Sequence, residues 1–210
     1  LRVRFSTSHP KDITDDVLFA IRDYKNICNY IHLPAQSGNT RILEKMNRTY
    51  TREWYNDKVS RIREVIPTCA ISTDIITGFC SETDKEHADT VDLMKTVRYD
   101  LAYMFFYSER PGTLAQKKFE DDVPEVIKKK RLSEIIEIQT QVNKEQHAAT
   151  IGQTFEVLIE GVSKRSENEL RGKTSQNKMI IFPKENYKIG DYVNVKVESS
   201  TSATLLGTAV

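Results

Sequence analysis

The sequence predicts an α/β fold, half of a TIM-like barrel of parallel strands, followed by a small all-β barrel. Three observations support this. Four strand-like segments alternate with helical patterns over about the first 115 residues, which is typical of parallel βα units. A long helical pattern follows, and then five short strand-like segments, which are typical of a closed barrel of the oligonucleotide-binding kind. We place the boundary near Thr150, so the expected domains are residues 1–149 and 150–210.

The expected strands of the α/β part are short apolar or alternating segments that end in polar turns. They are Arg2–Ser6, Tyr30–Leu33, Ala70–Ile76 and Leu101–Tyr107. Thr14, Thr51 and Thr83 are expected to cap three helices, and a shorter helix is expected around Ile42. Four such units amount to half of an eight-fold barrel.

Pro124 is expected to open a long helix that ends near His147. Its basic residues at positions 128–131 are expected to form a charged face, with Ile135 and Val142 on the apolar face. The short strands of the β-barrel are then expected at 155–159, 170–174, 179–182, 192–197 and 204–208.

The stretch from Ser72 to Thr83 organises the α/β part. An apolar strand runs into a turn at Gly78, and Thr83 with Glu86 three residues later has the spacing of a capping box. Ligands of parallel α/β proteins lie at the carboxyl ends of strands, so Asp74, Gly78 and Glu82 form a candidate site. Ordinary turn chemistry explains the same pattern and is the alternative interpretation.

Polar residues also follow the other expected strands, and parallel strands would bring them to one face. They are Thr7, Ser8, His9, Gln36, Ser37, Gly38, Ser108, Glu109 and Arg110. Arg110 could clamp a carboxylate or phosphate, and Gln36 could bind a base edge or a ribose. His9 precedes a proline and is interpreted as a capping or packing residue. No nucleophile with an adjacent base is present, so this face is expected to bind a ligand without itself supplying the reactive group.

In the β-barrel, basic residues outnumber acidic ones over a short stretch. The basic residues are Lys164, Arg165, Arg171, Lys173 and Lys178, against Glu167 and Glu169. Such a strip, with Asn177 in a turn and Phe182 nearby for stacking, suits single-stranded or looped RNA. A solvated charged face is the alternative interpretation.

The composition is that of a globular protein: 39% hydrophobic, 29% charged and a formal net charge of +1 over 210 residues. No apolar run approaches the roughly 18 to 20 residues of a membrane span, and no signal-peptide pattern begins the chain. We therefore expect a cytoplasmic protein without a membrane partner. The chain opens without methionine inside a strand-like segment, so it is also expected to be a piece of something longer.

Cys28, Cys69 and Cys80 are 41 and 11 positions apart, so no CxxC pair is encoded. Free, largely buried thiols are the expected state.

Four segments in this order resemble blocks of the radical S-adenosylmethionine (SAM) methylthiotransferases. They are R-V-R-F-S-T-S-H-P, H-L-P-A-Q-S-G-N-T-R-I-L-E-K-M-N-R, S-T-D-I-I-T-G-F-C-S-E-T and Y-S-E-R-P-G-T-L-A. The tail, with V-L-I-E-G-V-S-K-R and G-K-T-S-Q-N-K, resembles the TRAM domain that ends these enzymes and binds RNA. The resemblance covers essentially the whole chain. It implies a partial radical SAM barrel followed by a TRAM barrel.

The resemblance also implies an activity, cofactors and a partner. The closest type converts N6-isopentenyladenosine beside the anticodon of tRNA to its 2-methylthio derivative. A reduced 4Fe-4S cluster would cleave SAM to a radical that attacks the adenine ring, and a second 4Fe-4S cluster would supply the sulfur. A second SAM would supply the methyl group. The expected partner is therefore the anticodon stem-loop of tRNA.

Site residues follow from the same resemblance. Residues expected near the cofactor are Ser8, Gln36, Asp74, Gly78 and Arg110, with Ser8 and Arg110 close to a substrate or cofactor carboxylate. Residues expected to hold tRNA phosphates are Lys164, Arg165, Lys173, Asn177 and Lys178. No catalytic side chain and no metal ligand is assigned within this sequence.

The chain departs from the family in two ways. It contains neither the CxxxCxxC motif of the radical cluster nor the three cysteines of the second cluster, and Cys80 and Ser81 replace the usual proline and glycine. The chain alone is therefore expected to be catalytically silent, as the carboxy-terminal part of a longer enzyme. The alternatives are an enzyme for threonylcarbamoyladenosine in tRNA and a non-catalytic RNA-binding module. A half-barrel would also expose sheet edges, so self-association is expected.

Overall fold

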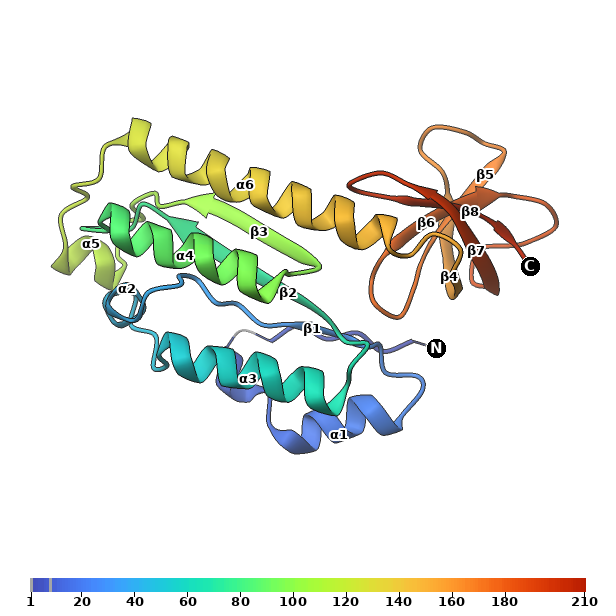
Figure 1. Cartoon of the computed structure of the whole chain (residues 1–210), viewed down its shortest axis with the longest axis horizontal. Helices are drawn as coiled ribbons and strands as arrows, with labels where there is room; N and C mark the ends of the chain where they lie inside the picture. The colour runs from blue at the N-terminus through green and yellow to red at the C-terminus, as the bar shows by residue number, and fades with distance from the viewer. Residues whose placement is uncertain (1, 8) are drawn as a thin grey trace.

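A computed structural model describes residues 2–7 and 9–210. It contains a parallel sheet of three strands, with one long helix lying along it, and a closed barrel of five strands beyond the end of that helix (Figure 1). The sheet strands are β1 (Tyr30–His32), β2 (Ala70–Thr77) and β3 (Leu101–Phe106), in the order β1-β2-β3. Both strand pairs are parallel, with Ile31 opposite Ile71 and Asp74 opposite Tyr103. The predicted α/β part with a parallel sheet is confirmed.

The first expected strand is largely wrong. In the segment Arg2–Ser6 only Val3 pairs, in a single parallel bridge to Ile27. The amide of Val3 donates to the carbonyl of Asn26 at 2.7 Å, and the amide of Cys28 donates to Val3 at 2.9 Å. This segment lies beside residues that precede β1, and its arginines turn toward the barrel, so no regular ladder forms.

The helices cover the sheet and connect its strands. They are η1 (Pro10–Asp12), α1 (Asp15–Asp23), α2 (Thr40–Lys45), α3 (Arg52–Val65), α4 (Asp84–Val97), α5 (Leu114–Lys118) and α6 (Glu125–Ala148). Thr83 and Glu86 form the predicted capping box, and Thr51 accepts a hydrogen bond from the amide of Trp54. Thr14 occupies the N-cap position of α1 without a side-chain cap bond. Helix α5 was not predicted, because its short sequence follows a proline–glycine turn.

The core of the α/β part lies between the sheet and these helices. It contains buried aliphatic and aromatic side chains, among them Leu18, Ile31, Tyr55, Ile71, Met94 and Ile135. Burying one such side chain contributes about 1.5 to 3 kcal/mol. No helix in the described ranges is long and apolar enough to cross a membrane.

The charged face expected on α6 is wrong in part. Lys129 and Lys130 are exposed, but Lys128 and Arg131 are only 4% and 6% exposed. One helical turn separates these two residues, so both point into the protein. They are tolerated there because each is paired with a carboxylate.

The predicted β-barrel is confirmed. Its strands are β4 (Thr154–Val162), β5 (Glu169–Lys173), β6 (Met179–Pro183), β7 (Tyr192–Ser200) and β8 (Leu205–Ala209). They close in the order β4-β5-β6-β8-β7 around a core that includes Val157, Leu170, Phe182 and Val195. Helix α6 ends at Ala148 and β4 begins at Thr154. The domain boundary near Thr150 falls in this connection and stays a prediction.

Candidate functional site

One face of the sheet carries a chain of polar side chains. The hydroxyl of Tyr30 lies 2.6 Å from Oγ of Ser72, and Nδ1 of His32 lies 2.9 Å from the same oxygen. Nε2 of His32 lies 3.4 Å from Oδ2 of Asp74. Alternation along β2 places Ser72 and Asp74 on the same face, since they are two residues apart. Among these four polar side chains, only Asp74 is predicted as a site residue from the sequence, because His32 and Tyr30 lie within a strand rather than after it.

Tyr30, His32 and Asp74 border a cavity of about 380 Å³ between the sheet and the β-barrel. Its lining also includes Arg4 and Phe5 from the first segment, Tyr103 from β3, and Lys173 and Asn177 from the barrel. Asp74 is half-buried and faces this cavity, whose lining includes the cationic side chains of Arg4 and Lys173. The structure thus brings a residue predicted for the cofactor together with two predicted for RNA.

Gln36 contributes its backbone to the sheet. Its amide donates to the carbonyl of Asp74 at 2.8 Å, and its carbonyl accepts from the amide of Ile76 at 2.9 Å. Its φ angle of 68° is left-handed, and the residue is buried. These bonds hold the turn after β1 against β2, close to Asp74.

Gly78 ends β2 with a φ angle of 68°. Its amide donates to Oε2 of Glu82 at 2.7 Å. A Cβ atom at this position would lie 2.4 Å from Cγ of Lys128. The glycine is therefore required by the packing of α6, independently of any ligand. Burial raises the pKa of Glu82, while the Gly78 amide and Arg131 oppose that shift.

Arg110 lies in an exposed loop after β3 and lines a second cavity of about 540 Å³. The other lining residues include Ile76, Phe105 and Tyr107, so this cavity is mainly apolar with a guanidinium at its border. It shares no lining residue with the cavity at Asp74, but Ile76 and Phe105 lie two residues beyond Asp74 and Tyr103 along the paired strands β2 and β3. Ser8 is outside the described residues.

Thr7 and His9 have local structural roles. The hydroxyl of Thr7 donates to the carbonyl of His32, and Nδ1 of His9 accepts from the amide of Lys11 at 3.2 Å. His9 also packs edge-on against Tyr50, with ring centroids 5.3 Å apart. The interpretation of His9 as a capping and packing residue is confirmed.

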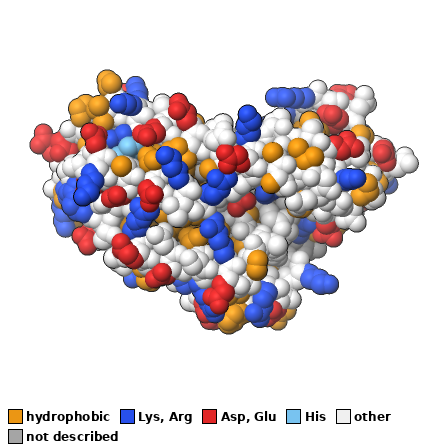
Figure 2. Space-filling view, in the orientation of Figure 1, with side chains coloured by type: hydrophobic (Ala, Val, Ile, Leu, Met, Phe, Trp, Pro, Cys, Tyr) orange, Lys and Arg blue, Asp and Glu red, His pale blue; other side chains and the backbone are white. Residues whose placement is uncertain are grey.

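The residues predicted to bind RNA fall into two groups. Lys164 and Arg165 are exposed in the loop between β4 and β5. Lys173, Asn177 and Lys178 are half-buried where the barrel meets the α/β part. Basic and acidic side chains are interspersed on the face in Figure 2, which agrees with the near-neutral net charge.

Several contacts hold the barrel against the sheet. Nη1 of Arg2 donates to the carbonyl of Lys173 at 2.6 Å, and the amide of Asn29 donates to Oγ of Ser175 at 2.8 Å. Nζ of Lys178 lies 3.6 Å from Oδ1 of Asp100, whose pKa is raised by burial. Lys178 thus has a docking role that sequence reasoning missed, since the contact joins residues far apart in the chain.

The three cysteines are free and buried, as predicted. Burial raises the pKa of Cys69 to about 12, so this thiol is not a ready metal ligand. Among the described residues, no group of three or more histidine, cysteine or acidic side chains could hold a metal ion. An iron–sulfur cluster therefore does not fit this part of the chain.

Comparison with known proteins defines the class. A family model described as the radical SAM superfamily matches residues 1–94, and a TRAM domain model matches residues 148–210. Coproporphyrinogen III oxidase from Escherichia coli, described as a radical SAM enzyme, superposes with a TM-score of 0.53. The match covers 96% of this chain and 50% of that one at 15% identity, and shows the fold alone. Fold and matches together define a radical SAM protein with a TRAM domain.

Sequence relatives narrow the class. The tRNA-2-methylthio-N(6)-dimethylallyladenosine synthases of Phocaeicola vulgatus and Parabacteroides distasonis are 53% and 54% identical to this chain over 210 residues. That of Chloroherpeton thalassium is 50% identical over 210 residues. Each match covers 100% of this chain and 46% or 47% of the relative, so the chain spans about half the length of the curated relatives it matches. Over its whole length the chain is therefore similar to these synthases, and it carries a radical SAM match followed by a TRAM domain match.

Proposed function

We propose that this chain is the carboxy-terminal part of a tRNA methylthiotransferase. The whole enzyme would convert N6-isopentenyladenosine next to the anticodon to its 2-methylthio derivative in the cytoplasm. The observation that carries the proposal is the uniform name of relatives that are at least 50% identical over the full chain.

SAM, when bound beside a reduced cluster, supplies the radical and the methyl group of this chemistry. The residues of this chain fit SAM and not the clusters. Asp74 can accept hydrogen bonds from ribose hydroxyls or from an ammonium group, and His32 fixes its carboxylate. Gln36 and Gly78 would contribute through the backbone shape of the two turns that they form. Ser8 stays a candidate from the family resemblance.

The carboxylate end of SAM or a substrate phosphate calls for a cation. Arg110 is exposed at the border of the apolar cavity and forms no ion pair with the described residues. A planar guanidinium binds such groups in a bidentate manner. Because Arg110 lines a different cavity from Asp74, we expect its ligand to be the substrate rather than the cofactor.

The anticodon stem-loop of tRNA would lie across the TRAM barrel and the opening beside it. Lys164 and Arg165 are exposed and free to neutralise phosphates. Lys173 and Asn177 face the cavity that Asp74 also lines, so they would contact a nucleotide inserted there. Lys178 is engaged with Asp100 and would support the barrel's position.

The test uses the full-length protein that carries this chain, reconstituted anaerobically with iron and sulfide. It is incubated with reductant, SAM and isopentenylated tRNA, and the nucleosides are analysed by mass spectrometry. The methylthio nucleoside is the expected product. Product only from threonylcarbamoylated tRNA would change the substrate, and RNA binding without any product would favour a binding module.

A further inference from the structure

Two buried cations of α6 face the turn that follows β2. We propose that Lys128 and Arg131 are positioning residues, which fix the turn Gly78–Glu82 in the shape that the candidate cofactor site requires. The inference rests on the proposed function for the identity of the ligand. Its structural part, that α6 sets the shape of this turn, does not depend on the ligand.

Arg131 holds the far end of the turn. Its Nη1 donates to the carbonyl of Glu82 at 3.0 Å and to Oε2 of Glu82 at 2.9 Å, and its Nη2 donates to Oδ1 of Asp84 at 2.7 Å. The same Oε2 accepts the amide of Gly78 at 2.7 Å. One carboxylate oxygen thus connects the first residue of the turn to α6.

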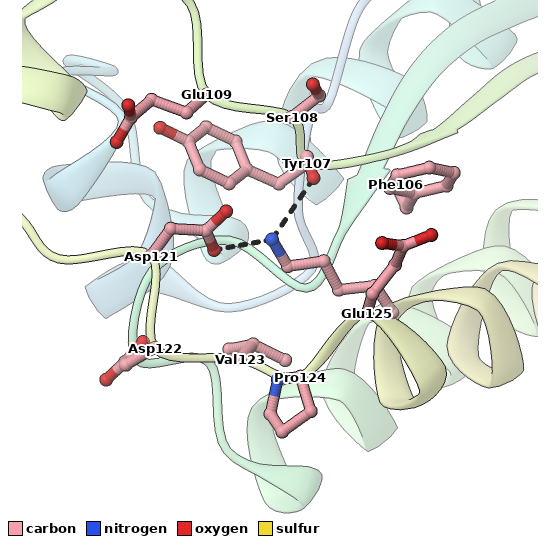
Figure 3. Close-up of a pocket in the computed structure, with 10 residues that line it drawn as sticks. Phe106, Tyr107, Ser108, Glu109, Asp121, Asp122, Val123, Pro124 and Glu125 are labelled. Carbon is pink, nitrogen blue, oxygen red and sulfur yellow. Dashed lines mark hydrogen bonds and ion pairs between the residues drawn. The ribbon is translucent and has the colours of Figure 1, made fainter.

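Lys128 holds the near end. Its alkyl chain occupies the space where a side chain at position 78 would be, with Cγ 2.4 Å from the site of a Cβ. Its Nζ donates to the carbonyl of Tyr107 at 3.2 Å and to the carboxylate of Asp121 (Figure 3). Lys128 therefore joins the turn after β2 to the loops on both sides of α5.

Packing alone does not account for these two residues. A buried ion pair is often no more stable than well-packed apolar side chains of the same volume. The neighbouring Lys129 has the same charge and helix propensity, yet it lies at the surface and pairs with Glu125. The guanidinium of Arg131 is instead directed at the one turn that ends the central strand, where ligands of parallel α/β proteins bind. The alkyl chain of Lys128 lies against the same turn, while its ammonium group is held by Tyr107 and Asp121.

The first test measures amide hydrogen exchange in the 210-residue chain. In Lys128→Met both polar bonds to the loops around α5 are lost, so the side chain that lies against Gly78 is no longer anchored at its end. Exchange at Gly78–Glu82 should therefore be about tenfold faster, with the TRAM barrel unchanged. Because removal of Arg131 alone could unfold the chain, the double variant Glu82→Gln/Arg131→Gln replaces the ion pair by a neutral one. It should show the same local acceleration. Lys129→Met is the matched control and should leave exchange unchanged.

The second test uses the reconstituted full-length protein. The KM for SAM should rise about tenfold in Lys128→Met, while the KM for tRNA stays within about twofold of the parent value. Arg131→Lys, which keeps the charge, should recover most of the loss seen in the neutral double variant. Unchanged exchange at Gly78–Glu82 in both variants would overturn the inference, and so would an equal rise of both KM values. If the parent binds no SAM, the proposed function fails, and the exchange result alone decides the role of α6.

Discussion

Oε2 of Glu82 and Nη1 of Arg131 lie 2.9 Å apart in the interior of the α/β part, with the glutamate side chain fully buried. The pair joins the end of the central strand to the helix that leads into the TRAM barrel. Oε1 of Glu82 and Nε of Arg131 have no hydrogen-bond partner among the described residues. Loss of Arg131 therefore leaves the buried carboxylate of Glu82 without a cation, whereas loss of Glu82 leaves Arg131 paired with Asp84 alone.

Replacement of Arg131 by methionine should destabilise this chain by about 3 to 5 kcal/mol, because the carboxylate of Glu82 then lacks its cation. Urea unfolding at pH 7 measures the change. Burial raises the pKa of Glu82 in the folded protein above the usual value of 4.5. The contribution of this protonated carboxyl to the free energy of unfolding is therefore fully present below pH 4.5, and it is lost as the pH rises through the folded-state pKa. The defect of the variant should therefore shrink below pH 4.5. Arg98→Met removes an exposed ion pair with Glu145 and should cost less than about 1 kcal/mol.

Glu86 should have the opposite pH dependence. Hydrogen bonds, first from Arg41 and then from the backbone and hydroxyl of Thr83, lower its pKa to about 2. Its stabilisation is therefore present above pH 4.5 and is lost as pH falls toward 2. Because Arg41 is partly exposed, we expect only about 1 to 2 kcal/mol from this group. In Glu86→Gln, the free energy of unfolding, measured by circular dichroism, should fall less steeply between pH 4.5 and pH 2 than in the unchanged chain.

Replacement of Gly78 by alanine should destabilise the chain by about 2 to 4 kcal/mol, since a positive φ angle and a clash with Lys128 both oppose a side chain. Gly112→Ala is the matched control. Gly112 also has a positive φ angle, but no atom lies within 4 Å of its added Cβ, so only about 1 kcal/mol is expected. The double variant Gly78→Ala/Lys128→Ala tests the contact itself. If the two single effects simply add, the clash is not the cause.

Binding of an anticodon stem-loop RNA to this chain should weaken when Lys164 and Arg165 are both replaced by alanine. The plot of log K against log salt concentration has a negative slope, and each lost phosphate contact makes it less steep by about 0.7 to 0.9. A fluorescence titration over a range of salt concentrations measures both quantities. Lys184→Ala/Lys188→Ala removes two charges from the turn between β6 and β7. An equal change of slope in this control would show a diffuse charge effect instead of a defined site.

Much of the fold could be predicted from local signals. The parallel sheet, the capping box at Thr83 and the five barrel strands all follow from short-range periodicity and turn residues. The first strand could not, because a pairing partner decides whether an alternating segment becomes a strand. Helix α5 was missed since five residues carry too little periodicity for a prediction.

The candidate site was predicted less completely than the fold. Asp74 does face a cavity, but His32 and Ser72 were not singled out, because their contact depends on the register of β1 and β2. Sequence likewise could not separate Lys128 from Lys129, since their burial depends on how α6 lies on the sheet. The docking role of Lys178 depends on Asp100, a residue of the other part of the chain.

Helix α6 has a further consequence for the spacing of the two parts. It holds the turn after β2 through Lys128 and Arg131 near its start, and Nδ1 of His147 lies 2.8 Å from the carbonyl of Thr201 in the barrel near its end. One residue inserted between these anchors would rotate the TRAM barrel by about 100° and shift it by about 1.5 Å. The length of this helix thus sets both the rotation of the TRAM barrel about the helix axis and its distance from the sheet. An insertion of about seven residues, close to two full turns, would nearly restore the orientation of the barrel.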